Sequence, residues 1–316
     1  MNNDPRSKPG VVLNAQKRTR TSTGFYSHQH LKLARLPIPP SGPRILRRGS
    51  ESIPTPRRVS RLAGDPYHGA MPDSNVETGF QTTGPDGSED AGVLRLNEIF
   101  HSIQGESTRA GEPCVFIRLA GCHLRCSWCD TEYAFREGRR RPVAEILEEV
   151  LAIDCGLVEI TGGEPLLQKT VHVLERALLD AGRTVMFETS GACDITACDP
   201  RSEIIMDLKP PSSGECDRNL DSNIEALRPH HEVKFVIGDR NDFDWSIERV
   251  RTLALLDRCR AVLFSPVFEQ AQGLEIAGAS GLPPGRLAEW ILASGLPIRM
   301  QMQLHKFIWE PTTRGV

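Results

Sequence analysis

The chain has 316 residues, and its 39% of apolar residues is enough to bury the core of one large domain or two smaller ones. It has 38 basic residues (Lys and Arg) and 41 acidic residues (Asp and Glu). Residues 1–64 hold 13 basic and 2 acidic residues, and residues 65–92 hold no basic and 6 acidic residues, so the remainder has 25 basic and 33 acidic residues. This acidic remainder argues against a surface that neutralises many nucleic-acid phosphates. The sequence also lacks an apolar run of about 18 residues and a secretory signal, so we expect a cytoplasmic protein that acts on a small molecule, away from nucleic acids and membranes.

Residues 1–92 are rich in Pro, Ser, Gly and Arg, and their apolar residues are too sparse to form a core. We predict a disordered extension over 1–92 and one folded domain over 93–316. Three origins of the extension are open: a start codon assigned too far upstream, with Met71 as the alternative, a true disordered tail, or an organelle transit peptide.

From Leu94 onward, short runs rich in β-branched residues alternate with helical patterns. The predicted strands are 115–121, 157–161, 184–189, 203–208, 232–237 and 261–265, and the predicted helices include 142–152, 166–181, 243–256 and 284–294. Such alternation indicates βαβ units and a mostly parallel sheet. Six strand–helix repeats predict an α/β fold, a partial (β/α)6 TIM-like barrel, with the active site at the C-terminal ends of the strands.

Three cysteines follow the first of these strands with the spacing Cys-x3-Cys-x2-Cys: Cys122, Cys126 and Cys129. Structural zinc sites use four closed ligands, and electron-transfer clusters use four cysteines. Three cysteines can instead bind three irons of a 4Fe-4S cluster and leave the fourth iron open to another ligand. The alternatives are a zinc loop completed by His123 or a distant cysteine, and a chance spacing.

A second motif, Gly162-Gly163-Glu164-Pro165, ends the next strand. Glycines let a backbone approach a ligand closely. The two motifs in this order, one helix apart, resemble those of radical S-adenosylmethionine (SAM) enzymes. There the open iron and the Gly-Gly-Glu-Pro element bind SAM, and its reductive cleavage gives a 5′-deoxyadenosyl radical that abstracts a substrate hydrogen atom.

Residues 94–310 resemble the 7-carboxy-7-deazaguanine synthases. The resemblance rests on residues 97–100, 102–106, 116–119, 121–122, 128–131, 161–165, 188–191 and 303–306. It implies a lyase that converts 6-carboxy-5,6,7,8-tetrahydropterin to 7-carboxy-7-deazaguanine with loss of ammonia, on the route to queuosine and other 7-deazapurines. It also implies a Mg2+ ion, a homodimer, and a reductant such as flavodoxin or ferredoxin.

The resemblance assigns roles to individual residues. The cluster would be held by Cys122, Cys126 and Cys129, and Mg2+ by the hydroxyl of Thr131. The expected SAM-binding residues are Trp128, Asp130, Gly163, Ser190, Asp207, Leu208, Lys209 and Ser265. The expected substrate-binding residues are Ile103, Gln104, Gly105, Glu106, Arg118, Thr161 and His305.

Plainer interpretations exist for several of these residues: a surface ion pair for Arg118, a solvated turn for Glu106, strand packing for Thr161, a turn for Ser190 and a core position for His305. The sequence also departs from the family pattern. Serine stands at 107 where some members have glycine. The chain also continues beyond His305 to Val316, so whether its terminal carboxylate reaches the substrate, as it can in the family, is open. Two other functions are also open: an activase that makes a glycyl radical on a partner protein, and a non-catalytic iron–sulfur or zinc protein.

Overall fold

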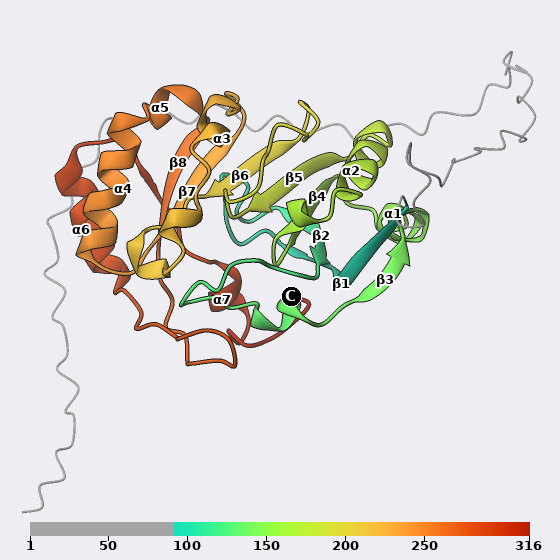
Figure 1. Ribbon diagram of the computed structural model, residues 1–316, viewed down its shortest axis with the longest axis horizontal. Coiled ribbons are helices and arrows are strands. Elements are labelled where there is room, and N and C mark those ends of the chain that lie inside the picture. Colours follow the sequence, from blue (N-terminus) through green and yellow to red (C-terminus); the bar gives the residue numbers. More distant parts are fainter. Residues whose placement is uncertain (1–91) are drawn as a thin grey trace, which may run out of the picture. The chain divides into compact units, whose positions relative to one another are not determined.

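The computed structural model describes residues 92–316, so the predictions for residues 1–91, including the alternative start at Met71, lie outside the described residues. Residues 92–316 form one sheet of nine strands in the order β3-β1-β2-β4-β5-β6-β7-β8-β9. The strands curve round as a fan from β1 to β8 in Figure 1, and the two edges of the sheet do not pair with each other. The architecture is therefore an open, partial barrel, as expected.

All six predicted strands are present and run parallel to one another. They are β2 Pro113–Leu119, β4 Leu157–Gly162, β5 Thr184–Thr189, β6 Glu203–Asp207, β7 Glu232–Ile237 and β8 Ala261–Pro266. The two-residue strand β9, Arg299–Met300, extends the parallel set beyond β8. These strands could be predicted from the sequence because a sheet that is covered on both faces requires strands with nearly continuous apolar runs.

Two further strands precede and follow the first of these and were not predicted. Strand β1, Val93–Ile103, pairs antiparallel with β2 and with β3, Arg139–Pro142. A shift in register between Leu96 and Glu98 interrupts the alternation of β1, so the strand lacks a clean period of two.

Helices α1 Val143–Leu151, α2 Val171–Asp180, α4 Arg240–Thr252 and α6 Pro284–Ser294 lie along the outer side of the sheet (Figure 1). The start of α4 is earlier than predicted because the Asp239 side chain accepts a hydrogen bond from the Asp242 amide at 2.9 Å and caps the helix. The helix ends at Thr252, and Ala254, with a left-handed φ of 50°, separates it from α5 Leu255–Arg258.

The expectation that every strand is followed by a helix is wrong at two connections. Residues 190–202, between β5 and β6, form a loop without a helix, and the connection from β6 to β7 contains only short turns and α3, Ser222–Glu225. The loop is instead fastened by side-chain hydrogen bonds to the neighbouring helix.

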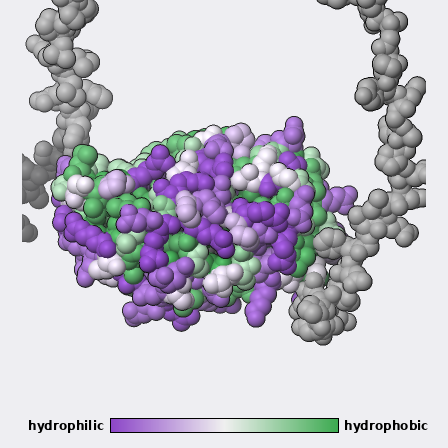
Figure 2. Space-filling view, turned by 90° about the horizontal axis from the view of Figure 1, so that it is seen from above, coloured by the Kyte–Doolittle hydropathy of each residue, from purple (hydrophilic) through white to green (hydrophobic). Residues whose placement is uncertain are grey.

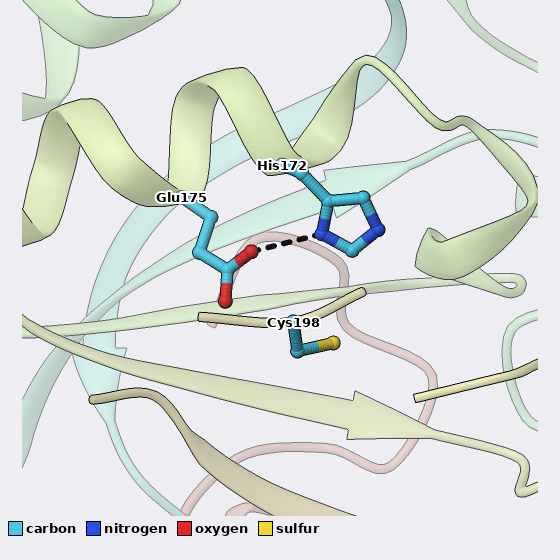
Figure 3. A group of neighbouring side chains, drawn as sticks. All are labelled: His172, Glu175 and Cys198. Atoms are coloured by element: carbon cyan, nitrogen blue, oxygen red, sulfur yellow. Dashed lines mark hydrogen bonds and ion pairs between the residues drawn. The ribbon is translucent and has the colours of Figure 1, made fainter. Parts of the chain in front are cut away.

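Glu175 of α2 provides this fastening. One carboxylate oxygen accepts from the Asp199 amide at 2.8 Å and from the Ser202 hydroxyl at 2.6 Å, while the other lies 2.9 Å from Nδ1 of His172 (Figure 3). Cys198 lies beside this pair, and the three side chains could together hold a metal ion, since their ligand atoms are within 4.8 Å of one another. The protein donors already satisfy the buried carboxylate, as a structural role requires.

The two faces of the strands have different character. Outward-facing residues such as Val115, Ile160 and Phe187 pack with the helices in the main core. Inward-facing residues begin with a small apolar layer that contains Phe116 and Met186. Beyond this layer, towards the C-terminal ends of the strands, the inward positions become polar and charged, because side chains alternate along a strand. The sheet therefore directs its charged residues into one cavity.

Hydrophilic residues are spread over the face of the molecule in Figure 2, with smaller hydrophobic areas among them. Within residues 92–316, none of the helices combines the length and the apolar character needed to cross a membrane.

Candidate active site

A cavity of about 680 Å³ lies at the C-terminal ends of the parallel strands. Its walls come from β2, β4, β5, β6 and β7, from the cysteine loop, from α7 His305–Ile308 and from residues 310–316. The volume falls within the range of about 300–1,000 Å³ that is usual for small-molecule sites. All seven expected substrate-binding residues, all three cluster cysteines and Thr131 line this one cavity.

The cysteine loop begins where β2 ends and is fixed to neighbouring segments by backbone hydrogen bonds. The amide of Gly121, a residue with φ of 97°, donates to the carbonyl of Ala134 at 2.8 Å, and the amide of Ser127 donates to the carbonyl of Ser213 at 3.0 Å. The amide of Leu124 lies 3.4 Å from the sulfur of Cys122. These hydrogen bonds fix the shape of the loop.

The Gly-Gly-Glu-Pro segment lies directly against this loop. The Gly163 amide donates to the carbonyl of Leu119 at 3.1 Å, and the Glu164 amide donates to the carbonyl of Gly121 at 2.8 Å. A Cβ at position 163 would lie 2.7 Å from the carbonyl carbon of Gly121 and 2.8 Å from Cβ of Cys122. Glycine is thus required here by close contact between two loops.

The side chain of Glu164 is completely buried and fully hydrogen-bonded within the protein. It accepts from the Leu166 amide, the Thr189 hydroxyl, the Ser190 amide and the Ser190 hydroxyl, at 2.5–3.0 Å. It therefore joins the end of β4 to the end of β5. Ser190 lines the cavity, but its hydroxyl is already engaged in this contact.

The three cysteines that the sequence predicts as cluster ligands all line the cavity. Burial raises the pKa of each thiol, and that of Cys129 to about 12. Metal binding requires deprotonated sulfur, so iron must displace these protons. Within residues 92–316 the other six cysteines are also free thiols; of these, Cys114 and Cys155 are buried and the remaining four are partly buried.

Next to the cysteines, Asp207 and Lys209 supply a polar wall suited to SAM. The Lys209 ammonium donates to one Asp207 carboxylate oxygen at 2.8 Å, while the other oxygen is buried and has no hydrogen-bond partner among residues 92–316. A buried acceptor without a donor is costly, so this oxygen suits a hydroxyl-bearing or ammonium-bearing ligand. Trp128, Asp130 and Gly163 line the same cavity.

Two expected SAM-binding residues are not part of the cavity wall. The Leu208 side chain packs into the main core, because it points to the helix side of the sheet, and its amide donates to the carbonyl of Lys234 at 2.9 Å. Ser265 is fully buried, and its hydroxyl has no partner among the described residues. Their roles in binding SAM stay predictions.

The segment from Gln104 to Glu106 forms another part of the cavity wall. The Gln104 side chain donates to Glu159 and accepts from the Glu106 amide at 3.0 Å, so both ends of its amide are used within the protein. A Cβ on Gly105 would lie 3.0 Å from the His305 amide nitrogen, which explains glycine at this position. Ser107 has a left-handed φ of 64°, a conformation that glycine adopts more readily than serine.

Arg118 points into the cavity and is held at one end. Its Nε donates to Glu98 at 2.8 Å, and the hydroxyl of Tyr133 donates to the same carboxylate oxygen at 2.9 Å. The guanidinium also lies 5.6 Å from the centre of the Phe100 ring. This arrangement orients the outer nitrogens for a two-pronged contact with a carboxylate.

Thr131 lies at the cavity rim, 3.8 Å from the sulfur of Cys129. Neighbouring Asp130 pairs with Lys306 of α7 at 2.6 Å. Burial opposes ionisation of Asp130, but Lys306 outweighs this effect and the pKa of Asp130 lies below its usual range. Among the described residues the Thr131 hydroxyl has no shorter hydrogen bond than this contact with Cys129, so it is compatible with a hard cation that takes its other ligands from substrate and water.

Sequence reasoning missed three charged residues of the cavity floor, Glu159, Glu188 and Lys234. Each is a charged residue inside a predicted apolar strand, and this was a usable signal because such residues are rarely buried without a partner. Val316 also lines the cavity, together with the rest of residues 310–316.

Comparisons with known proteins agree with this geometry. Residues 116–264 match the model of the radical SAM superfamily. The chain is 44% identical to the 7-carboxy-7-deazaguanine synthase of Koribacter versatilis over 227 residues, which are 71% of this chain and 100% of that protein. It is also 44% identical to the protein of the same name from Chlorobaculum tepidum, over 71% of this chain and 97% of that protein.

The crystal structure of QueE from Escherichia coli shares the fold, with a TM-score of 0.54 and 24% identity over 67% of this chain and 95% of that one. The radical SAM assignment implies a 4Fe-4S cluster and SAM as cofactors. The cavity, its three thiols and the extent of the sequence identity lead to one conclusion: the chain belongs to the 7-carboxy-7-deazaguanine synthase family of radical SAM lyases.

Proposed function

We propose that this protein converts 6-carboxy-5,6,7,8-tetrahydropterin to 7-carboxy-7-deazaguanine with release of ammonia, in the biosynthesis of queuosine or a related 7-deazapurine. One observation carries the proposal: the cavity that the three cysteines line is also lined by Gln104, Gly105, Glu106 and Arg118. A substrate bound there lies beside the cofactor site, and the names of the relatives supply the product.

Arg118 binds the substrate carboxylate in this proposal. Glu98 fixes the guanidinium through Nε, and this leaves a planar pair of N–H groups for the ligand. Glu106 accepts hydrogen bonds from the N–H groups of the aminopyrimidinone ring, since its carboxylate faces the cavity and its pKa is lowered to about 2 despite burial. Thr161 and His305 contact the substrate from the floor and from α7.

The cysteines, Gly163, Asp207 and Lys209 hold the cofactors in this proposal. When bound, the cluster and SAM supply the one-electron chemistry that starts the reaction. The protein holds the two ligands close together, and α7 and residues 310–316 cover the cavity and exclude water.

Mg2+ is part of the proposal, with the Thr131 hydroxyl and the substrate carboxylate among its ligands. The resemblance to the family further supports a homodimer and reduction by flavodoxin or ferredoxin. We place the protein in the cytoplasm because thiol ligands stay reduced there. Light scattering on the purified protein tests the dimer.

The function is tested by anaerobic incubation of the reconstituted protein with dithionite, SAM, Mg2+ and 6-carboxy-5,6,7,8-tetrahydropterin. Mass spectrometry should detect 7-carboxy-7-deazaguanine, and ammonia should accumulate with it. Release of 5′-deoxyadenosine without this product would contradict the proposed substrate.

A further inference from the structure

Lys234 is a buried cation at the centre of the cavity floor. It stands on β7, and its side chain is only 4% exposed. Its ammonium donates to Glu106 at 2.8 Å and to Glu188, and it lies 3.6 Å from a carboxylate oxygen of Asp207. These three carboxylates raise the pKa of Lys234 well above its usual value although burial opposes the charge, so the side chain is a cation.

The carboxylate of Glu106 depends on this cation. Burial raises the pKa of Glu106, but Lys234 and, to a smaller extent, His305 lower it to about 2. Gln303 donates to one carboxylate oxygen at 2.9 Å, and Gln301 lies 3.3 Å from the other, which Lys234 also contacts. These amides orient the carboxylate, but only Lys234 contributes a full charge by direct contact.

A neighbouring carboxyl shows what happens without a cation in contact. Glu159 is buried on β4, and its hydrogen bond comes from the neutral amide of Gln104. Burial and the nearby Glu188 raise its pKa well above the usual value. The pKa values of the carboxyl groups on this floor therefore shift in opposite directions: that of Glu106 is lowered, whereas those of Glu159 and Glu188 are raised. Lys234 contacts both Glu106 and Glu188, but only Glu106 of these three also accepts hydrogen bonds from Gln301 and Gln303 among the described residues.

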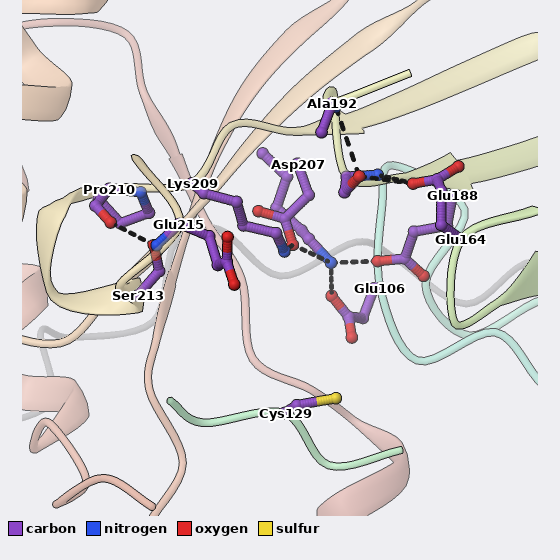
Figure 4. Close-up of polar contacts among 12 residues, drawn as sticks. Glu106, Cys129, Glu164, Glu188, Ala192, Asp207, Lys209, Pro210, Ser213 and Glu215 are labelled. Atoms are coloured by element: carbon purple, nitrogen blue, oxygen red, sulfur yellow. Dashed lines mark hydrogen bonds and ion pairs between the residues drawn. The ribbon is translucent and has the colours of Figure 1, made fainter. Parts of the chain in front are cut away.

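Lys234 also reaches the cofactor side of the cavity. A carboxylate oxygen of Asp207 lies 2.8 Å from the ammonium of Lys209 and 3.6 Å from that of Lys234. Figure 4 shows Asp207 and Lys209 together with Glu106 and Glu188. Because Lys209 is the nearer cation, Asp207 keeps a charged partner when Lys234 is removed, whereas Glu106 keeps the neutral amides of Gln301 and Gln303.

We infer that Lys234 is a positioning residue of the proposed reaction, which holds the Glu106 carboxylate as an acceptor for the pterin ring. The inference rests on the proposed function, because it assumes that Glu106 contacts the substrate. A purely structural ion pair would affect folding and leave substrate affinity and its pH dependence unchanged in the folded enzyme.

The test compares Lys234→Met and Lys234→Arg with the wild type, all with the cluster reconstituted. Lys234→Met should raise KM for the pterin about 30-fold or more, because it removes one partner of a buried charge pair. Lys234→Arg should restore most of this loss, since it keeps the charge. The dissociation constant of SAM should change little in both variants because Lys209 still pairs with Asp207. The exposed Lys169→Met is the matched control and should behave as wild type.

The pH dependence of KM separates positioning from folding. The charged or titratable groups that face Glu106 are Lys234, His305, Glu159 and Glu188. In the wild type Glu106 is ionised far below neutrality, so it contributes no change in KM between about pH 6 and 8. In Lys234→Met, burial raises the pKa of Glu106, and KM should rise as the pH falls through this range, relative to the wild-type profile.

The double variant Lys234→Met/Glu106→Gln keeps the test valid if the single variant folds poorly, because it removes both charges of the Lys234–Glu106 pair and leaves Glu188 as the carboxyl that has lost its ammonium donor. Its KM should stay high while the additional pH dependence disappears. An unchanged KM in Lys234→Met, or additional pH dependence that persists in the double variant, would overturn the inference. Absence of product from the wild type in the same assay would refute the proposed function instead, so the two failures can be told apart.

Discussion

Substitution of Gly163 by alanine should disturb the cluster loop through a single methyl group. The added Cβ would lie 2.7 Å from the Gly121 carbonyl carbon and 2.8 Å from Cβ of Cys122, which is about 0.6–0.7 Å inside the ordinary limit of 3.4 Å. Both neighbours are stiff, one being backbone and the other the first atom of a ligand side chain. Overpacking of this kind costs about 1–3 kcal/mol. The strain falls on Cys122, so we expect a lower iron content together with reduced stability.

The assay measures iron and sulfide per chain after anaerobic reconstitution, with the thermal unfolding midpoint recorded in parallel. Gly156→Ala is the matched control, since a Cβ there meets no atom within 4 Å. We expect Gly163→Ala to lose a substantial part of its iron and about 2–4 °C in Tm for each kcal/mol of destabilisation. A Gly163→Ala protein with full iron content and the Tm of the control would refute the argument from close contact.

Three further changes probe single contacts. Cys126→Ala should abolish the cluster's absorption band and SAM cleavage, and retention of both would reject the ligand assignment. Thr131→Val keeps the shape of the side chain but removes the hydroxyl. It should therefore weaken the response of turnover to added Mg2+ and leave the iron content intact. An unchanged Mg2+ titration would count against a role of Thr131 in binding Mg2+. Glu98→Gln removes the charge that fixes Arg118. We expect KM for the pterin to rise about tenfold, because a hydrogen bond to a charged group is lost. A KM within error of wild type would show that Arg118 is positioned by other contacts.

The parallel strands could be predicted because each is a short apolar run buried on both faces. Strand β1 could not be predicted, since its register shift between Leu96 and Glu98 interrupts the alternation of side chains on which strand prediction relies. The sequence pattern also did not predict that residues 190–202 form a loop without a helix. Its structure depends on Glu175, which lies on a preceding helix and whose buried carboxylate accepts hydrogen bonds from the Asp199 amide and the Ser202 hydroxyl.

The candidate site was predicted where its residues form local motifs. The cysteine loop and the Gly-Gly-Glu-Pro segment are each contiguous in sequence, and they meet because parallel strands end at the same edge of a sheet. The pairing of Lys234 with Glu106 joins residues that are 128 positions apart, and that of Lys306 with Asp130 joins a late helix to the cysteine loop. No short motif encodes such contacts, so they required the three-dimensional arrangement.

The central claim is that substrate and SAM meet in this one cavity and react through a hydrogen-atom transfer. Turnover of 6-carboxy-5,6,7,8-tetrahydropterin deuterated at its carbon-bound positions tests this directly, with mass spectrometry of the 5′-deoxyadenosine that is formed. Our account predicts deuterium in the 5′-deoxyadenosine of the wild type and none when Arg118 is replaced by alanine, since the substrate is then not held at the cofactor. 5′-Deoxyadenosine without deuterium from the active wild-type enzyme would contradict it.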